Sequence, residues 1–407
     1  MRKRALRAIA ECLHIATMSE ESGRITRRFL TPPTRDVHAY LRNRMEGMGM
    51  TVHTDAAGNL RGLWTPQGVT GRHLILGSHI DTVPDAGPYD GVLGVTIALE
   101  LLDLARELAI PLPIEVIAFS EEEGVRFGIP FLGSRAVAGR FDPALLALKD
   151  ADGVTLDGAI RTYGLDPRQI FAAAIEEETL GFLEIHIEQG PVLEAEGLSV
   201  AAVTGIVGQS RLNLEFAGQA NHTGTTPMHL RRDALAGAAE WIGMVEARTR
   251  VGKDLVATVG RIEVTPNADN VIAGTARVSL DVRHLHDAQR IGALNEILES
   301  ADRIAERRKL ALQCTPQMDQ PAVPMDERLT AYMTDAIKAA GFPPKQMSSG
   351  AGHDAMVMAG RMPTTMLFLR SPGGISHNPA EAVRDEDVDA ALEVSRRFLE
   401  RLAAEVG

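Results

Sequence analysis

Apolar positions recur with helical spacing at the start of the chain and then give way to shorter runs. In residues 3–18 and 35–49 they are spaced by three and four, which predicts two helices. Residues 51–64 predict a hairpin with a turn at Ala57-Gly58-Asn59. The chain is therefore expected to begin with two helices and a pair of strands.

A strand, a helix and a strand follow. The apolar run 73–81 predicts a buried strand, roughly residues 94–109 predict an amphipathic helix, and the run IEVIAFS predicts the next strand. This spacing is typical of a βαβ unit, so we expect a parallel or mixed sheet. Residues 140–180 predict only short helices and loops, and another strand is expected at 181–188.

The pattern changes near residue 210. RLNLEFAGQ alternates apolar and polar residues, as a half-exposed antiparallel strand does. A helix, the strands LVATVGRIEV and TARVSLDVRH, a helix and a last strand follow, and the order β-α-β-β-α-β is ferredoxin-like. From residue 326 the chain returns to the pattern of the first domain, with a helix at 326–340, a strand at 364–370 and a helix at 385–404. We expect a discontinuous first domain, 1–209 and 326–407, with a second domain inserted at 210–325.

Composition narrows the possible partners. The chain has 407 residues, 45% of them apolar, and a net charge of −12, which argues against nucleic acid and against an anionic membrane surface. Its two cysteines, Cys12 and Cys314, lie far apart, which is typical of reduced thiols. The N-terminal segment lacks the apolar core of a signal peptide, and no run approaches the ~18 apolar residues of a membrane span. We therefore expect a cytoplasmic protein.

Acidic and imidazole side chains stand at or just beyond the ends of the predicted strands. Ligands bind open α/β sheets at the carboxyl ends of strands. So many acidic and imidazole groups placed there are poorly explained by core packing and well explained by a two-metal hydrolytic site. The set is His79, Asp81, Asp90, Glu121, Glu122, His186 and His377.

Each of these residues also has a simpler explanation when it is considered alone. Asp90, at the start of a helix, could be an N-cap. His186 could be a satisfied core histidine, and His377 could be a surface residue of a Gly-rich loop. The acidic residues 121–123 could be a solvated charge run. The joint occurrence of all of them at strand ends favours the metal site.

The residue types indicate the chemistry. Imidazole and carboxylate ligands without thiolate suit Zn²⁺, with Mn²⁺, Co²⁺ or Ni²⁺ as alternatives. Adjacent glutamates can supply one carboxylate for a metal and another to take a proton from water. Asp81, two residues after His79 on one strand face, can accept the second imidazole N–H and so fix the tautomer.

Several segments together resemble the di-zinc aminoacylase-type metallopeptidase superfamily. More closely, they are similar to its amidase/hydantoinase/carbamoylase branch, which contains N-carbamoyl-L-amino acid hydrolases, allantoate amidohydrolases and β-ureidopropionases. The segments, which span residues 77–381, are GSHIDTV with DGVLGV, SEEEGVRFG, HIEQGPVLE, NHTGTTPM, GAGHDA and GISHNPAE. The resemblance implies an α/β fold: a di-zinc exopeptidase-like catalytic domain with a mixed sheet flanked by helices, and an inserted ferredoxin-like lid or dimerisation domain.

The resemblance implies two divalent metal ions per subunit, with zinc expected first. Asp90 would bridge the two ions. His79 and His186 would complete one site, and Glu122 and His377 would complete the other.

The resemblance also implies catalytic roles. Glu121 would be the general base that activates water and returns a proton to the leaving nitrogen, and Asp81 would orient His79. His222 would donate to the developing oxyanion from the partner subunit's lid, which implies a homodimer with composite sites.

Substrate contacts are implied as well. Arg283 and Asn270 of the inserted domain would hold a substrate carboxylate, and Gln189 with the backbone around Gly352 would hold the ureido end. Taken alone, Arg283 could form a salt bridge within its domain and Asn270 could be a turn residue.

Four positions leave details open. His353 and Asp354 could cap and orient the helix that follows them. Thr223 stands where the family usually has Ala, and Asn378 where Ser is commoner. Neither change removes an expected ligand.

The expected function is hydrolysis of N-carbamoyl-L-amino acids to amino acid, ammonia and carbon dioxide. Allantoate hydrolysis is the alternative, because both substrates carry a ureido group and a carboxylate. Cleavage of N-acyl amino acids or dipeptides is disfavoured by His186, where many peptidase relatives place a carboxylate. A metal-binding scaffold without activity is disfavoured by Glu121, because a scaffold needs no base.

Overall fold

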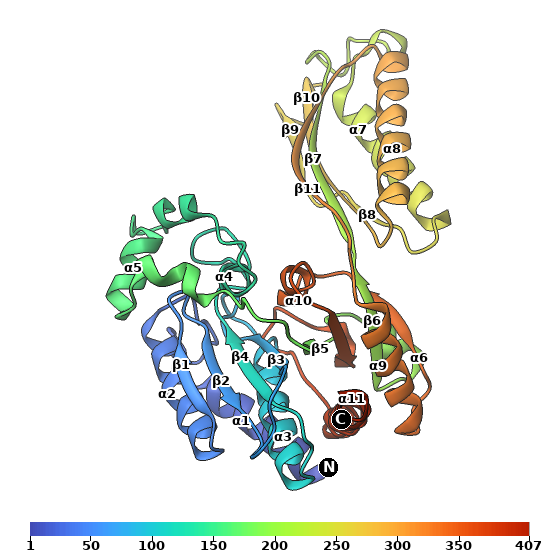
Figure 1. Ribbon diagram of the computed structural model, residues 1–407. Coiled ribbons are helices and arrows are strands. Elements are labelled where there is room, and N and C mark those ends of the chain that lie inside the picture. Colours follow the sequence, from blue (N-terminus) through green and yellow to red (C-terminus); the bar gives the residue numbers. More distant parts are fainter. Residues whose placement is uncertain (407) are drawn as a thin grey trace. The chain divides into compact units, whose positions relative to one another are not determined.

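The structure is a computed structural model that describes residues 1–406. The chain divides into two compact units, which Figure 1 shows in ribbon form. The first comprises Met1–Thr204 together with the chain from Met325 onward, and the second is Gly205–Pro324.

A mixed sheet forms the centre of the first unit. Its strand order is β1-β2-β4-β3-β5-β14-β6-β12, and β13 also pairs with β6. The central strands β4, β3, β5 and β14 run parallel, and the flanking pairs run antiparallel. The strands are β1 Thr51–Thr54, β2 Leu60–Trp64, β3 Leu74–His79, β4 Ile114–Phe119, β5 Gly181–Ile187, β6 Val200–Ile206, β12 Val323–Pro324, β13 Gln346–Ser349 and β14 Thr364–Leu369.

Helices flank this sheet. Apolar residues of α1, α2, α3, α9 and α11 share one large core with the strands, whereas α4 and α5 contribute to a separate, smaller cluster. The helices are α1 Arg2–Ala16, α2 Pro32–Gly47, α3 Val92–Glu107, α4 Leu132–Val137, α5 Leu156–Tyr163, α6 Val192–Glu196, α9 Glu327–Ala339, α10 Asp354–Met358 and α11 Asp385–Val406. Short 3-10 turns lie at Pro143–Ala147, Pro167–Ala173 and Pro372–Gly374.

The elements predicted for the first unit are largely confirmed. The hairpin forms from β1 and β2, with Thr51 opposite Leu63. The βαβ unit forms from β3, α3 and β4, whose two strands are parallel. Strand β6 was not predicted, because its sequence VAAVTGI is short, rich in small residues and without a clear period.

The second unit has an antiparallel sheet with two long helices, and its apolar residues form a core of their own. The strand order is β11-β7-β10-β8, with β9 also paired to β10, which is the strand order of a ferredoxin-like fold. The elements are β7 Gly208–Ala217, the turn Met228–Leu230, α7 Ala234–Val251, β8 Val256–Thr258, β9 Ile262–Thr265, β10 Thr275–His284, α8 Asp287–Arg308 and β11 Ala311–Gln320.

One predicted strand of this unit is divided in two. The run LVATVGRIEV forms β8 and β9, and both strands pair with β10. Thr258 lies opposite Asp281 and Ile262 opposite Val278, so one extra residue stands on the divided strand. Such a bulge locally interrupts a ladder. The role of this unit as a lid or dimerisation domain remains a prediction.

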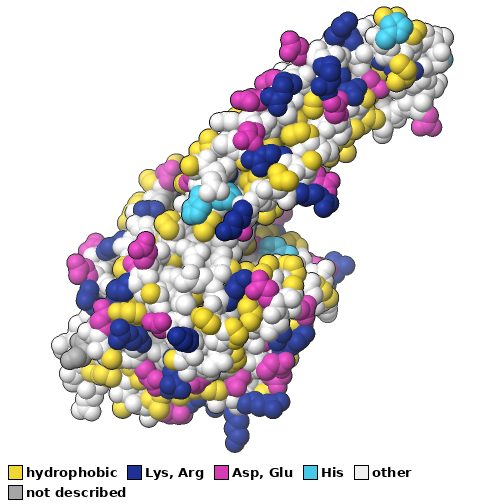
Figure 2. All heavy atoms as spheres, turned by 90° about the vertical axis from the view of Figure 1, so that its right-hand side faces the viewer, with side chains coloured by type: hydrophobic (Ala, Val, Ile, Leu, Met, Phe, Trp, Pro, Cys, Tyr) yellow, Lys and Arg dark blue, Asp and Glu magenta, His cyan; other side chains and the backbone are white. Residues whose placement is uncertain are grey.

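The surface carries charged side chains of both signs. Lys and Arg side chains are interspersed with Asp and Glu on the face shown in Figure 2. None of the helices within residues 1–406 is long and apolar enough to cross a membrane.

A fully buried carboxylate ties three helices of the first unit together. Glu100 of α3 has no exposed surface and receives hydrogen bonds from Arg4 and Arg7 of α1 and from Arg44 of α2, at 3.1, 2.6 and 2.9 Å. Arg4 also pairs with Asp103, and Arg44 also pairs with Glu11, so removal of Glu100 takes away only part of the compensation of these two cations.

We therefore expect Glu100→Ala to lower the free energy of unfolding by roughly 1–3 kcal/mol, measured by urea denaturation. The matched control is Glu46→Ala, because the ion pair of Glu46 with Arg42 is solvent-exposed and 3.8 Å long. The control should change stability by about 0.5 kcal/mol or less. Equal effects of the two substitutions would contradict this account.

Candidate metal centre

Neighbouring parallel strands carry two of the predicted ligands to the same edge of the sheet. β3 and β5 are paired, His79 is the last residue of β3, and His186 is next to last in β5. Asp90 lies in the loop before α3. Gly91 follows it with a φ of 68°, and a Cβ at this position would lie 2.5 Å from the His79 ring. The loop can therefore approach His79 only with glycine there.

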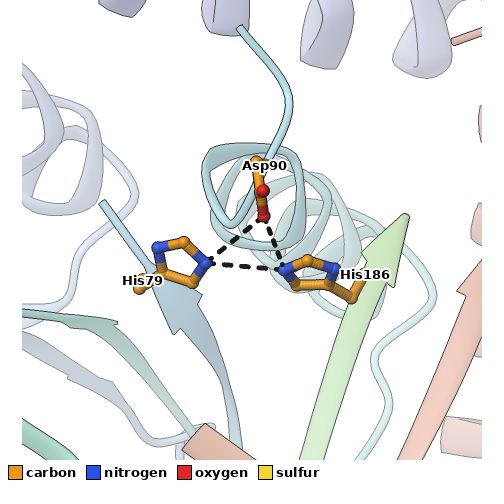
Figure 3. Close-up of side chains that lie close together, drawn as sticks. All are labelled: His79, Asp90 and His186. Carbon is orange, nitrogen blue, oxygen red and sulfur yellow. Dashed lines mark hydrogen bonds and ion pairs between the residues drawn. The ribbon is translucent and has the colours of Figure 1, made fainter. Parts of the chain in front are cut away.

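Three side chains converge at this edge. Asp90 Oδ1 lies 3.1 Å from His186 Nε2 and 3.5 Å from His79 Nε2, and the two Nε2 atoms are 3.5 Å apart (Figure 3). All three residues are buried. Gly91, not Asp90, is the N-cap of α3, so the N-cap explanation of Asp90 does not apply.

The tautomers of the two histidines follow from their other contacts. His79 Nδ1 lies 3.0 Å from the Asp81 carbonyl oxygen, and His186 Nδ1 lies 2.9 Å from the Ile187 carbonyl oxygen. A carbonyl oxygen only accepts, so each Nδ1 carries a proton, and in a neutral ring each Nε2 then carries a lone pair. Asp90 Oδ1 is buried without a hydrogen-bond donor. Three lone-pair atoms thus face one another, and this donor set fits a divalent cation such as Zn²⁺.

A second group shares Asp90. His377 Nε2 lies 3.2 Å from Asp90 Oδ2 and 3.2 Å from Glu123 Oε1. Asp90, Glu123 and His377 therefore form another set that could hold a cation, and the two oxygens of Asp90 face different sets. His377 comes from the loop after β14 and has a φ of 54°.

The three adjacent glutamates after β4 differ in their surroundings. The sequence predicted Glu122 beside His377, but the structure places Glu123 there, and Glu122 groups with His79 and Glu123. Glu121 has no exposed surface, and its Oε1 accepts from the backbone N–H groups of Arg126 and Phe127 at 2.8 and 3.2 Å. Sequence reasoning missed Glu123 because the three glutamates are chemically identical; only the path of the loop distinguishes them.

Asp81 acts on two neighbours in different ways. β3 ends at His79, so Asp81 is not on the same strand face as predicted. Its carbonyl oxygen contacts His79 Nδ1, whereas its carboxylate oxygen is 3.8 Å away. The carboxylate instead accepts from the N–H groups of Glu122 and Glu123, at 3.0 and 3.1 Å. Asp81 thus links the His79 strand to the glutamate loop.

Electrostatics within the centre follow from this packing. Burial opposes ionisation of Asp90, but when the rings of the three surrounding histidines are protonated, their hydrogen bonds hold its pKa well below the usual range. Hydrogen bonds to Asp90 and Glu123 raise the pKa of His377 to about 10. Burial raises the pKa of Glu121 to about 8, and the charge of Asp81 adds to this shift.

A cavity of about 170 Å³ opens at the centre. Its polar side chains come from strand ends and from the loops between elements, and Phe131, Pro130 and Ala351 supply apolar wall. Glu121 is not among the lining residues, which are His79, Asp90, Glu122, Glu123, Pro130, Phe131, His186, Gln189, Ala351, Gly352, His353 and His377.

Two predicted substrate contacts, Gln189 and Gly352, line this cavity. Gln189 Nε2 donates to Asp90 Oδ2 at 3.0 Å and to Ser376 Oγ at 3.2 Å, and its Oε1 has no donor. His353 also faces the cavity, with its ring centroid 4.5 Å from that of His186. His353 makes no side-chain cap bond to α10; its Nε2 lies 2.8 Å from Ser349 Oγ.

The remaining predicted contacts belong to the second unit. His222 and Asn270 are exposed and lie in adjacent segments, where the Asn270 carbonyl accepts from the N–H of Thr223 at 3.2 Å. His222 Nδ1 accepts from the N–H of Gly224 at 3.0 Å. Arg283 on β10 is half-buried and pairs with Asp281 at 2.9 Å. Their roles toward substrate remain predictions.

Comparison with known proteins gives a consistent assignment. A family model described as peptidase family M20/M25/M40 matches residues 75–401. The chain is 38% identical to an N-carbamoyl-L-amino acid amidohydrolase of Geobacillus stearothermophilus, over 94% of this chain and 95% of that protein. It is 36% identical to an allantoate deiminase of Arabidopsis thaliana, over 97% of this chain and 81% of that protein.

A solved structure agrees. The amidase of the hydantoinase/carbamoylase family from Burkholderia multivorans is 30% identical and superposes with a TM-score of 0.92 over 98% of each chain. The fold, the matched family model and the relatives all confirm the resemblance found in the sequence. This chain belongs to peptidase family M20/M25/M40, within its branch of hydantoinase/carbamoylase-type amidohydrolases.

Proposed function

We propose that the protein hydrolyses the carbamoyl C–N bond of N-carbamoyl-L-amino acids in a metal-dependent reaction that releases amino acid, ammonia and carbon dioxide. The observation that carries this proposal is the shared carboxylate of Asp90, whose two oxygens face His186 and His377 at 3.1 and 3.2 Å. A carboxylate shared between two sets of ligands is what a two-metal hydrolytic site requires.

The ligand assignment follows from the two groups. Asp90, His79 and His186 would hold one divalent ion, and Asp90, Glu123 and His377 would hold the other. When bound, such ions polarise a carbonyl oxygen and lower the pKa of water. The ligand atoms of each group lie within 4.8 Å of one another, which supports the assignment.

In place of Glu121, we assign the general base to Glu122. Glu122 lines the cavity, and Asp81 holds its backbone N–H. Glu121 already accepts two backbone hydrogen bonds and does not line the cavity. Glu122 would take a proton from the attacking water and return it to the leaving nitrogen.

Residues around the cavity would recognise the substrate. The ureido end would lie near Gln189, whose Oε1 is free to accept from a ureido N–H, and near the backbone of Gly352. The resemblance supports Arg283 and Asn270 as partners of the substrate carboxylate and His222 as oxyanion donor. It also supports a homodimer, because His222 would come from the partner subunit.

Allantoate is the second candidate substrate. It offers the same ureido group and carboxylate, and the Arabidopsis thaliana relative, an allantoate deiminase, matches 97% of this chain. We place the carbamoyl amino acids first because this chain is 38% identical to the Geobacillus stearothermophilus relative and matches 95% of that protein's length.

The test is ammonia release from a panel of N-carbamoyl-L-amino acids, allantoate, N-acetyl amino acids and dipeptides. We expect the highest kcat/KM with an N-carbamoyl-L-amino acid. A higher value with allantoate would assign the alternative substrate. Activity confined to the N-acetyl compounds or dipeptides would contradict the proposed reaction class.

The assignment of the base predicts different effects of two conservative substitutions. Glu122→Gln should lower kcat by about 10²–10⁴-fold, because the amide cannot accept the proton. Glu121→Gln retains an oxygen that accepts the N–H groups of Arg126 and Phe127, so it should lower kcat by less than about tenfold. The opposite order of effects would return the role of base to Glu121.

The ligand sets predict metal content. Wild-type protein should bind two equivalents of Zn²⁺ or Mn²⁺, as measured by elemental analysis after dialysis, and chelation should abolish activity reversibly. His377→Ala should retain one equivalent, because the set of His79, Asp90 and His186 is intact. The exposed His53 of β1 provides the control, since His53→Ala should retain both. Two equivalents in His377→Ala would remove His377 from the ligand set.

A further inference from the structure

Glu381 is a buried carboxylate that binds the backbone around the shared ligand Asp90. It is 5% exposed. Its Oε1 accepts from the backbone N–H groups of Tyr89 and Asp90, at 2.8 and 3.0 Å. It does not line the cavity. Glu381 therefore acts on the loop that presents Asp90, at a distance of 291 residues along the chain.

The same residue also contacts the loop that carries His377. Ser376 Oγ lies 3.3 Å from Glu381 Oε2 and 3.1 Å from Asp90 Oδ2. A hydroxyl has one proton, so Ser376 can donate to only one of these carboxylates at a time. Glu381, Ser376 and Asp90 thus form a continuous polar contact that ends at the oxygen facing His377.

Close packing holds the two loops in this arrangement. A Cβ at Gly87 would lie 2.3 Å from the Glu381 Cβ, so only glycine lets the Asp90 loop approach so near. On the other side, the Asn378 carbonyl accepts from the N–H of Glu381 at 3.0 Å, and Asn378 Oδ1 accepts from the N–H of Ala380 at 2.9 Å. The asparagine that departs from the commoner serine therefore supports the turn that presents Glu381.

We propose that Glu381 is a positioning residue that fixes Asp90 Oδ2 against His377 and thereby sets the affinity of the second metal group. This inference rests on the proposed two-metal site. Without Glu381, two buried backbone N–H groups would lack an acceptor, and the Asp90 loop would move to satisfy them. Such a shift would disturb the group that joins two loops, Asp90 with His377 and Glu123. The group of His79 and His186 would also lose affinity, because Asp90 Oδ1 belongs to it, but it would lose less, because both histidines stand on paired strands.

The test is a Zn²⁺ titration of Glu381→Ala against a competing chelator, with two dissociation constants fitted. We expect the site that is lost in His377→Ala to weaken at least tenfold, and the other site to weaken less. Glu381→Gln retains an acceptor oxygen for the two N–H groups and should recover most of the loss. If Glu381→Ala does not fold, Glu381→Asp carries the same expectation, because its carboxylate is one methylene too short.

A matched control is Glu188→Ala. Glu188 is 7% exposed and accepts from the N–H groups of Val192 and Leu193, at 2.7 and 2.9 Å, at the start of α6. This variant should lose thermal stability and keep both zinc affinities. If the control loses as much zinc affinity as Glu381→Ala, or if both zinc affinities of Glu381→Ala are unchanged, the role of Glu381 is overturned and the two-metal site is not. A wild-type protein that binds one ion would overturn the two-metal proposal as well.

Discussion

The structure around the candidate centre depends on one carboxylate, that of Asp90, which faces histidines through both of its oxygens. Oδ1 meets His79 and His186, and Oδ2 meets His377. A buried carboxylate surrounded by lone-pair atoms is stable only when cations or protons lie between them. Histidines from β3, from β5 and from the loop after β14 contact this carboxylate, and Asp90 nevertheless stays buried.

Parallel pairing makes the convergence possible. β3 and β5 lie side by side and end at one edge, so a histidine near the end of each strand arrives at the same place. The loops that follow the strands then supply the carboxylates. Their backbones are held by other buried acceptors: Asp81 binds the glutamate loop, and Glu381 binds the Asp90 loop. Several carboxylates thus serve as hydrogen-bond acceptors that place the ligands.

The glutamates after β4 show how one loop gives identical residues different tasks. Glu121 turns inward with a φ of 51° and accepts backbone hydrogen bonds. Glu122 faces the cavity, and Glu123 reaches His377. In an acidic run the side-chain chemistry is uniform, so each role is set by the direction in which the loop presents the side chain. The proposed assignment differs from the expected one by a single residue: Glu122 becomes the base instead of a ligand, and Glu123 becomes the ligand.

Sequence by itself determined the class of the protein and most of its elements. The alternation of apolar runs and amphipathic stretches predicted the βαβ unit, because burial imposes a period on each element. Motifs such as GSHIDTV and GISHNPAE indicated the family. They also indicated Asp90 and the three histidines that lie around it, which are His79, His186 and His377. Tertiary structure alone decided which glutamate meets His377, that Asp81 contacts His79 through its carbonyl oxygen, and that Glu381 binds the Asp90 loop. These outcomes depend on loop paths and on contacts between residues far apart in the chain, and a local pattern of apolar and polar positions carries no information about either.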